Sequence, residues 1–243
     1  MKKVLVIIGL CILAGYLVFA AFFFESQPKD QLCTQFEITS VDGSESSLVD
    51  EVEIERHIDS KGLNPFGKPI KDINTYKIEQ AILENKLVKT ANVFVTSSGG
   101  IRAEIENRRP VLRVIASQGD NYYIDNERER VPLSKIYTAD LPLATGAVKE
   151  SFAKTDLYDF AVFLSKNTFW NDQIEQIVVL PNEDIKLIPR VGRQEIILGK
   201  LDNYQEKLNK LRAFYEKGIS ETGWNRYSVI NLKYDKQVVC TKR

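Results

Sequence analysis

The stretch Ala91–Asn107, ANVFVTSSGGIRAEIEN, is the clearest structural signal in the first half of the chain. It contains two runs in which apolar and polar residues alternate, and this alternation is typical of half-buried strands. Ser98, Gly99 and Gly100 separate the two runs, and a short glycine-containing connection of this kind favours a tight turn. The stretch therefore predicts a β-hairpin.

A strand and two helices are predicted before this hairpin. Phe36–Val41 alternates as a strand. Asp50–Gly62 predicts a helix, because Asp50 and Glu53 have the spacing of a capping box and a glycine follows the apolar positions. A second helix is predicted to begin near Asn74. The order β-α-α-β-β over residues 35–110 indicates a compact α+β module.

The pattern becomes richer in strands after Arg108-Arg109-Pro110. Five short strands are predicted at VLRVIAS, YYID, QIVVLP, DIKLIPR and QEIILG. Two helices are predicted among them, over residues 155–167 and 202–218, each with apolar residues at helical spacing on one face. Residues 111–243 are therefore predicted to form a mixed β domain with flanking helices, which makes the chain α+β overall.

The chain closes with a second predicted hairpin, Tyr227–Arg243, YSVINLKYDKQVVCTKR, whose turn falls near Asp235-Lys236. The last strand of a chain often lies at the edge of a sheet, where one row of backbone N–H and C=O groups has no partner. Proteins usually blunt such an edge, because it invites pairing with another strand. The sequence thus raises the question of which strand this edge would accept.

The N-terminus predicts a membrane anchor. Val4–Phe24 is apolar throughout and, at about 1.5 Å per residue, is long enough to cross the roughly 30 Å hydrocarbon core of a bilayer. A cleaved signal peptide would have a shorter apolar run that ends in small residues. Lys2 and Lys3 place residues 1–3 in the cytoplasm. Residues 25–34 are then a linker, and everything beyond lies outside the cytoplasm.

Composition and chemistry exclude several classes of function. The chain carries 33 basic and 33 acidic residues, whereas nucleic-acid binders have a basic surplus. His57 is the single histidine, so neither a histidine-based triad nor a two-histidine metal site can be built. We predict no catalytic, metal, cofactor or small-molecule site. Cys33 and Cys240 lie at opposite ends of the predicted exterior part, and nothing in the sequence brings them within bridging distance.

These features together resemble the bacterial cell-division family FtsQ, called DivIB in many Gram-positive bacteria. DEVEIERHI, GKPI and LVKTANVFV are similar to the helix, loop and second strand of the family's POTRA domain. IENRRPVLRV is similar to the turn into its β domain. YYID with Pro132, LPLATG and INLKYDKQVV resemble signposts within that domain. Two departures are the cytoplasmic stub, which is short, and Asp125–Arg130, which lacks the glycine that often precedes the proline.

The resemblance implies a non-catalytic scaffold of the division machinery in the bacterial inner membrane, at the septum. In such proteins the last β-domain strands dock the small bitopic proteins FtsB (DivIC) and FtsL, and the POTRA unit is available to other components. Strand addition supplies main-chain hydrogen bonds, and alternate side chains supply specificity. On this basis we expect Tyr234 to be an aromatic anchor and Lys233 to face an acidic partner residue. The predicted partner-binding set is Ile230, Leu232, Lys233, Tyr234, Gln237, Val238, Val239 and Thr241.

Two other functions remain open at the level of sequence. A membrane-anchored POTRA-type chaperone or translocation component would handle polypeptides at its strand edges. A tethered cell-wall hydrolase would need two carboxyl groups roughly 5–10 Å apart, for which DNERER and PNED are the acidic stretches. Tandem POTRA units would favour the chaperone, and release of fragments from peptidoglycan would favour the hydrolase.

Overall fold

The computed structural model describes residues 10–19, 31–41, 48–219 and 223–243. Residues 10–19 are helical and fall within the predicted span Val4–Phe24, whose two ends lie outside the described residues. Among the residues that the structure describes, no helix is both long enough and apolar enough to cross a membrane.

The chain divides into two compact units. Glu51–Asn85 and Thr90–Ile105 belong to the first unit, whereas Lys86–Lys89 and Glu106–Arg243 belong to the second. The division therefore cuts through two strands and does not fall at a single position. The boundary predicted at residue 110 stays a prediction.

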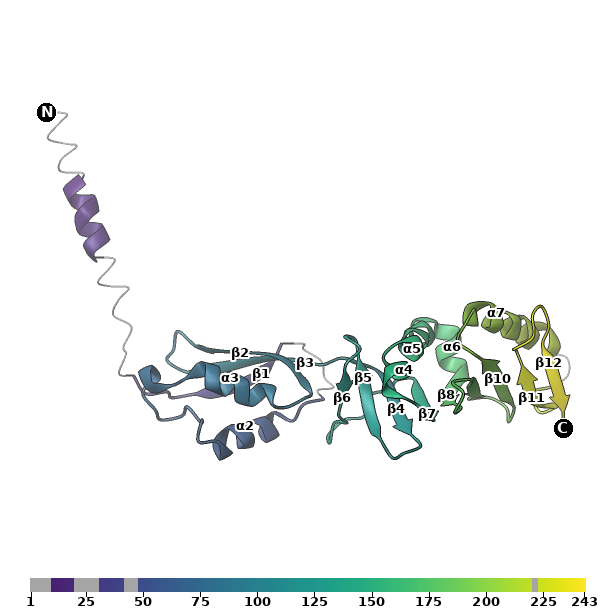
Figure 1. Cartoon of the computed structure of the whole chain (residues 1–243). Helices are drawn as coiled ribbons and strands as arrows, with labels where there is room; N and C mark the ends of the chain where they lie inside the picture. Colours follow the sequence, from purple (N-terminus) through teal and green to yellow (C-terminus); the bar gives the residue numbers. More distant parts are fainter. Residues whose placement is uncertain (1–9, 20–30, 42–47, 220–222) are drawn as a thin grey trace, which may run out of the picture. The chain divides into compact units, whose positions relative to one another are not determined.

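The first unit is a three-stranded sheet with two helices (Figure 1). The strand order is β1-β3-β2, and β1 runs parallel to β3. This confirms the predicted order β-α-α-β-β. Its elements are β1 (Phe36–Ser40), α2 (Glu51–Ser60), the 3₁₀ turn η1 (Ile70–Asp72), α3 (Thr75–Leu83), β2 (Val88–Val95) and β3 (Ile101–Asn107).

Local sequence explains why the helices of the first unit form where they do. Asn74 caps α3, because its side-chain oxygen accepts a hydrogen bond from the backbone N–H of Lys77 at 3.0 Å. Apolar residues at helical spacing then face the core, including Ile54 and Ile58 of α2 and Ile78 of α3, each at most 2% exposed. The predicted helix faces are therefore confirmed.

The second unit is a nine-stranded mixed sheet in the order β12-β11-β10-β9-β8-β7-β4-β5-β6. Its strands are β4 (Pro110–Ala116), β5 (Asn121–Asp125), β6 (Arg130–Val131), β7 (Leu143–Gly146), β8 (Ile174–Val179), β9 (Ile185–Pro189), β10 (Glu195–Gly199), β11 (Tyr227–Asn231) and β12 (Val239–Lys242). Its helices are α4 (Glu150–Ala153), α5 (Asp156–Lys166), α6 (Thr168–Gln173) and α7 (Tyr204–Phe214), and a π-helical turn, η2 (Tyr215–Ile219), follows α7.

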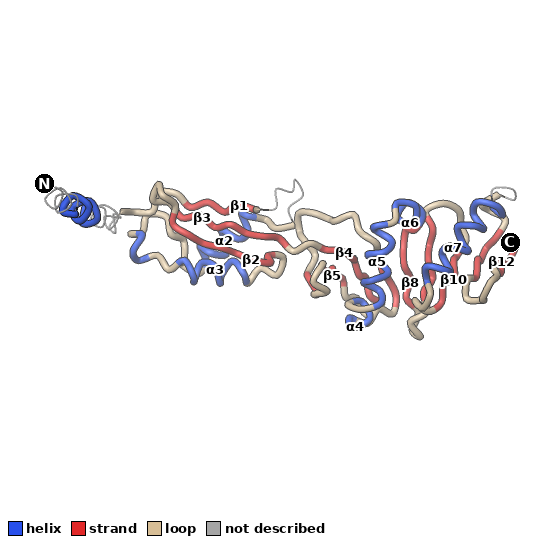
Figure 2. The backbone as a smooth tube through the Cα atoms, turned by 90° about the horizontal axis from the view of Figure 1, so that it is seen from above, coloured by secondary structure: helices blue, strands red, loops and turns tan. Residues whose placement is uncertain are grey.

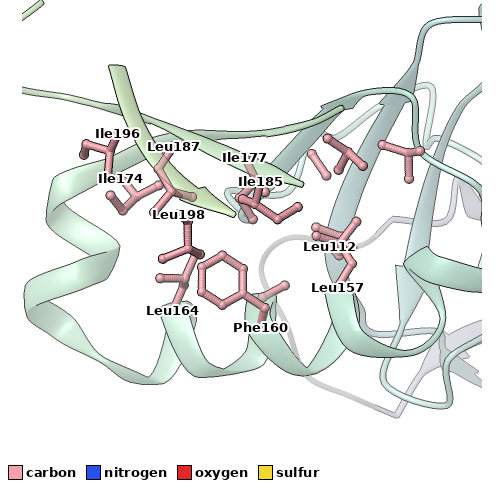
Figure 3. Close-up of a cluster of buried hydrophobic side chains, with 14 of the residues drawn as sticks. Leu112, Leu157, Phe160, Leu164, Ile174, Ile177, Ile185, Leu187, Ile196 and Leu198 are labelled. Atoms are coloured by element: carbon pink, nitrogen blue, oxygen red, sulfur yellow. The ribbon is translucent and has the colours of Figure 1, made fainter. Parts of the chain in front are cut away.

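Helices α5, α6 and α7 lie along the same face of this sheet (Figure 2). Figure 3 shows the cluster of buried side chains between α5 and the strands, with Phe160 of α5 directed toward Leu198 and its neighbours. Phe160 and Leu198 are fully buried. Burying a side chain of this size contributes roughly 1.5–3 kcal/mol, so this layer of contacts fixes the helices on the sheet.

The short connection between β3 and β4 holds Arg108, which forms a buried ion pair with the last residue of β5. Arg108 donates from Nη1 to Oδ2 of Asp125 at 2.6 Å, and the Asp125 side chain is only 1% exposed. The other carboxylate oxygen accepts from the backbone N–H groups of Glu127 and Glu129 at 2.9 and 2.8 Å. Asp125 thus closes the turn that follows β5 and ties it to the start of the second unit.

Candidate partner-binding edge

Strand β12 is the last strand at one end of the nine-stranded sheet (Figure 1). It pairs with β11 in antiparallel register, with Asn231 opposite Val239, Ile230 opposite Cys240 and Val229 opposite Thr241. No strand of the described residues pairs with its other side. The predicted terminal hairpin and its position at a sheet edge are therefore present.

The ladder on the inner side shows which backbone groups face outward. The N–H of Leu232 donates to the carbonyl of Ile197 at 2.9 Å, so alternate residues of β11 turn toward β10 and the others turn toward β12. Val239 and Thr241 consequently bond back to β11. The N–H and C=O groups of Cys240 and Lys242 point away from the sheet and are the ones that an added strand would meet.

The side chains of β12 divide between the two faces of the sheet. Val238, which precedes the strand, and Cys240 pack against the core cluster, and burial raises the pKa of the Cys240 thiol. Val239 is 42% exposed, and Gln237 and Thr241 are exposed as well. Three of the predicted residues are thus accessible near this edge, while Val238 is partly covered.

Ile230 and Leu232 require a correction. The sequence alone placed them on one face with Tyr234 as contacts for a partner, but both are fully buried in the core of the second unit. Tyr234, by contrast, is 49% exposed. The reason is that β11 ends at Asn231, so the strand alternation that placed the three residues together does not continue to Tyr234. Ile230 and Leu232 support the edge from inside.

Lys233 and Tyr234 lie in the loop 232–238 between β11 and β12. The Lys233 ammonium is 2.9 Å from Oδ2 of Asp184, a residue just before β9. The hydrogen bond with Lys233 lowers the pKa of Asp184, and the same bond raises the pKa of Lys233. Both groups are therefore charged at neutral pH, and Lys233 already has an acidic neighbour within its own chain.

Sequence reasoning did not find Asp184 or Lys210 among the residues around this loop. Lys210 of α7 donates to the backbone carbonyl of Tyr234 at 2.7 Å. Both contacts join positions far apart in the chain, 49 residues for Asp184 with Lys233 and 24 for Lys210 with Tyr234. Nothing in a local sequence pattern signals such pairs, because only the folding of the second unit brings these residues together.

The first unit also offers strand edges. Its order β1-β3-β2 gives β1 and β2 one neighbour each among the described strands. Val95, near the end of β2, is 41% exposed. An unpaired strand edge of this kind can accept a strand of another chain.

The residues considered for catalysis or cross-linking have ordinary structural surroundings. Nε2 of His57 lies 2.9 Å from Oε2 of Glu84, and Lys61 contacts the other oxygen of the same carboxylate at 2.6 Å, which links α2 to the end of α3. Cys33 and Cys240 are free thiols. Within the described residues, no group of three or more His, Cys, Asp or Glu side chains could hold a metal ion.

Comparison with known proteins agrees with this arrangement. A family model described as FtsQ/DivIB, C-terminal related, matches residues 109–241. This chain belongs to the FtsQ/DivIB family. A model of the POTRA-like domain matches residues 31–106 of the same FtsQ/DivIB protein. The resemblance drawn from the sequence is confirmed.

A curated relative carries the same assignment. The cell division protein FtsQ of Rhodothermus marinus is 25% identical to this chain over 184 residues, which cover 71% of this chain and 67% of that protein. Family membership and this relative together place the FtsQ/DivIB chain among the proteins of bacterial cell division.

Proposed function

We propose that this FtsQ/DivIB protein is a non-catalytic scaffold of the division machinery. It binds FtsB/DivIC- and FtsL-like bitopic proteins by strand addition at β12 and couples them to septal cell-wall synthesis. The observation that carries the proposal is the outer side of β12, where the backbone groups of Cys240 and Lys242 have no neighbouring strand among the described residues.

The surroundings of this edge suit a short peptide strand. Main-chain bonds to β12 would supply affinity, and the exposed side chains of Val239 and Thr241 would select the partner's residues on one face. Tyr234, half-exposed in the loop that leads into β12, is the proposed aromatic anchor, since interface hot spots favour tyrosine. Gln237 adds a polar contact at the rim.

The remaining parts of the proposal concern location. Val4–Phe24 is proposed as a single membrane anchor with residues 1–3 in the cytoplasm and the rest of the chain outside it, at the inner membrane of the septum. Residues 35–110 are proposed as a POTRA unit that receives other division proteins at its own strand edges. Residues 111–243 are proposed as the β domain that docks FtsB/DivIC and FtsL.

The edge can be tested with a matched pair of variants at one position. Cys240→Pro removes an outward N–H that the internal ladder does not use, whereas Cys240→Ala removes only the thiol and keeps that N–H. Binding of each purified chain to the FtsB- and FtsL-like pair of the same organism would be measured by calorimetry. A circular-dichroism melt checks that both variants are folded.

We expect Cys240→Ala to bind like the wild type and Cys240→Pro to bind more than about tenfold more weakly, because it removes one hydrogen bond and obstructs the incoming strand. Equal binding by the two folded variants would move the docking site away from β12. Failure of the wild-type chain to bind would reject the partner assignment.

A further inference from the structure

We infer that Lys233 is a positioning residue, and that together with Lys210 it clamps the loop 232–238 so that Tyr234 is presented at the docking edge. This inference rests on the proposed function, because Tyr234 matters only if a partner binds there. It replaces the expectation that Lys233 itself meets an acidic residue of the partner. Its basis is a set of contacts within the second unit.

The first contact anchors the side chain of Lys233. Its ammonium reaches Oδ2 of Asp184 at 2.9 Å across the end of β10. The lysine stem crosses Gly199 closely, because a Cβ on that glycine would lie 2.8 Å from Cγ of Lys233. Gly199 also has a φ of +78°, a conformation that other residues rarely adopt. The glycine thus leaves the path by which Lys233 reaches Asp184.

The Asp184 carboxylate is largely buried and has a second lysine close to it. Its residue is only 8% exposed, and its backbone N–H bonds to the Asn182 side chain at 3.2 Å. Lys200 lies 3.9 Å from the other carboxylate oxygen and also donates to the carbonyl of Asn182. Asp184 therefore sits between two ammonium groups, and a partner's carboxylate at Lys233 would compete with it.

The second contact anchors the backbone of the loop. The ammonium of Lys210 donates to the carbonyl of Tyr234 at 2.7 Å and lies 3.4 Å from that of Leu232. The N–H of Lys233 donates to Oδ1 of Asn231 at 3.0 Å. The carbonyls on both sides of Lys233 are thereby fixed to α7, and the N–H of Lys233 itself is fixed to β11. The Tyr234 side chain remains half-exposed.

The consequence for binding is pre-organisation. A loop that is ordered before the partner arrives saves the conformational entropy that a free loop would lose on binding. If Lys233 instead contacts the partner directly, binding requires a positive charge at position 233, whichever residue occupies position 184. The two roles therefore give opposite results when the charges of Lys233 and Asp184 are exchanged.

The test compares Lys233→Asp, Asp184→Lys and the double exchange in the full-length chain in mild detergent, with calorimetry against the FtsB- and FtsL-like pair. All three are made in a Lys200→Gln background, which removes the second ammonium near residue 184. We expect each single variant to bind about five- to thirtyfold more weakly, because freed loop residues must be reordered on binding. The double exchange should return the affinity to within about threefold of the Lys200→Gln parent. A double exchange as weak as Lys233→Asp would overturn the clamp in favour of a direct contact.

A second measurement does not depend on the partner. Amide hydrogen exchange of residues 232–238 should accelerate in Lys233→Gln and stay unchanged in Lys236→Gln, an exposed lysine of the same loop. The exchange of β9 should be equal in both variants, which shows that the sheet is intact. Unchanged exchange of the loop in Lys233→Gln would overturn the clamp even if the wild type binds. If the wild type does not bind the pair but loop exchange is accelerated in Lys233→Gln, the proposed function is rejected. The clamping of the loop by Lys233 is then still supported.

Discussion

Replacing Asp125 with alanine should destabilise the second unit more than any change at its surface. The carboxylate is 1% exposed and accepts three hydrogen bonds, from the Arg108 guanidinium and from the backbone N–H groups of Glu127 and Glu129. Alanine removes all three acceptor contacts at once. It leaves a partly buried cation and two amides without their acceptor.

The structure sets the size of this effect. Breaking a buried ion pair by removing one partner costs about 3–5 kcal/mol, and each amide that loses its bond adds to that range. Arg108 is still 24% exposed and lies 3.5 Å from Glu127, which offsets part of the loss. We therefore expect Asp125→Ala to lower the free energy of unfolding by about 3–4 kcal/mol. Asp125→Asn, which keeps the acceptor for the amides, should cost about 2 kcal/mol.

Tryptophan fluorescence during urea unfolding measures this change directly. Trp170 and Trp224 are the two tryptophans of the chain and lie in the same unit as Asp125. With a slope of about 2 kcal/mol per molar urea, the midpoint for Asp125→Ala should fall by about 1.5–2 M. The control is Asp159→Asn, which breaks the exposed pair with Arg128 and should change stability by less than about 1 kcal/mol. An Asp125→Ala midpoint equal to that of this control would contradict the stabilising role of the buried carboxylate.

Three further predictions concern the second unit. Burial raises the pKa of Tyr215 to about 12, whereas an unfolded tyrosine ionises near pH 10. Between these values the unfolded state binds fewer protons, so stability should fall by about 2–3 kcal/mol as the pH rises, and Tyr215→Phe should lack this part of the alkaline loss in urea titrations at each pH. Phe160→Ala should cost about 3–5 kcal/mol by the same unfolding assay, because the ring is fully buried, and a loss below about 1 kcal/mol would contradict that packing. Tyr234→Ala should leave the melting temperature unchanged, because the side chain is half-exposed, yet weaken partner binding measured by calorimetry.

The longer elements were predictable from local sequence. The helix predicted over residues 155–167 is α5, and the apolar residues of its one face, Leu157, Phe160, Ala161 and Leu164, are buried in the structure. Alternation likewise located β4, β8, β9 and β10. These elements are long enough for a hydrophobic period to repeat, and a repeated period is what a single sequence reports.

The short elements were missed for the complementary reason. Strand β6 has two residues, β7 and α4 have four each, and α6 has six. None of them completes enough of a helical or strand period to be distinguished from a loop. β7 exists as a strand because β4 and β8 pair with it on either side.

Local sequence predicted the order of the longer elements, the α+β class and the terminal hairpin, because turn residues and hydrophobic periods are local properties of the chain. The folded chain alone shows that Ile230 and Leu232 are buried, that the amides of Cys240 and Lys242 face outward, and that Lys233 pairs with Asp184. Burial and ion pairing depend on segments that become neighbours only when the strands assemble into the sheet and the helices pack on it. Such contacts join residues that are distant in sequence, so no local pattern contains them.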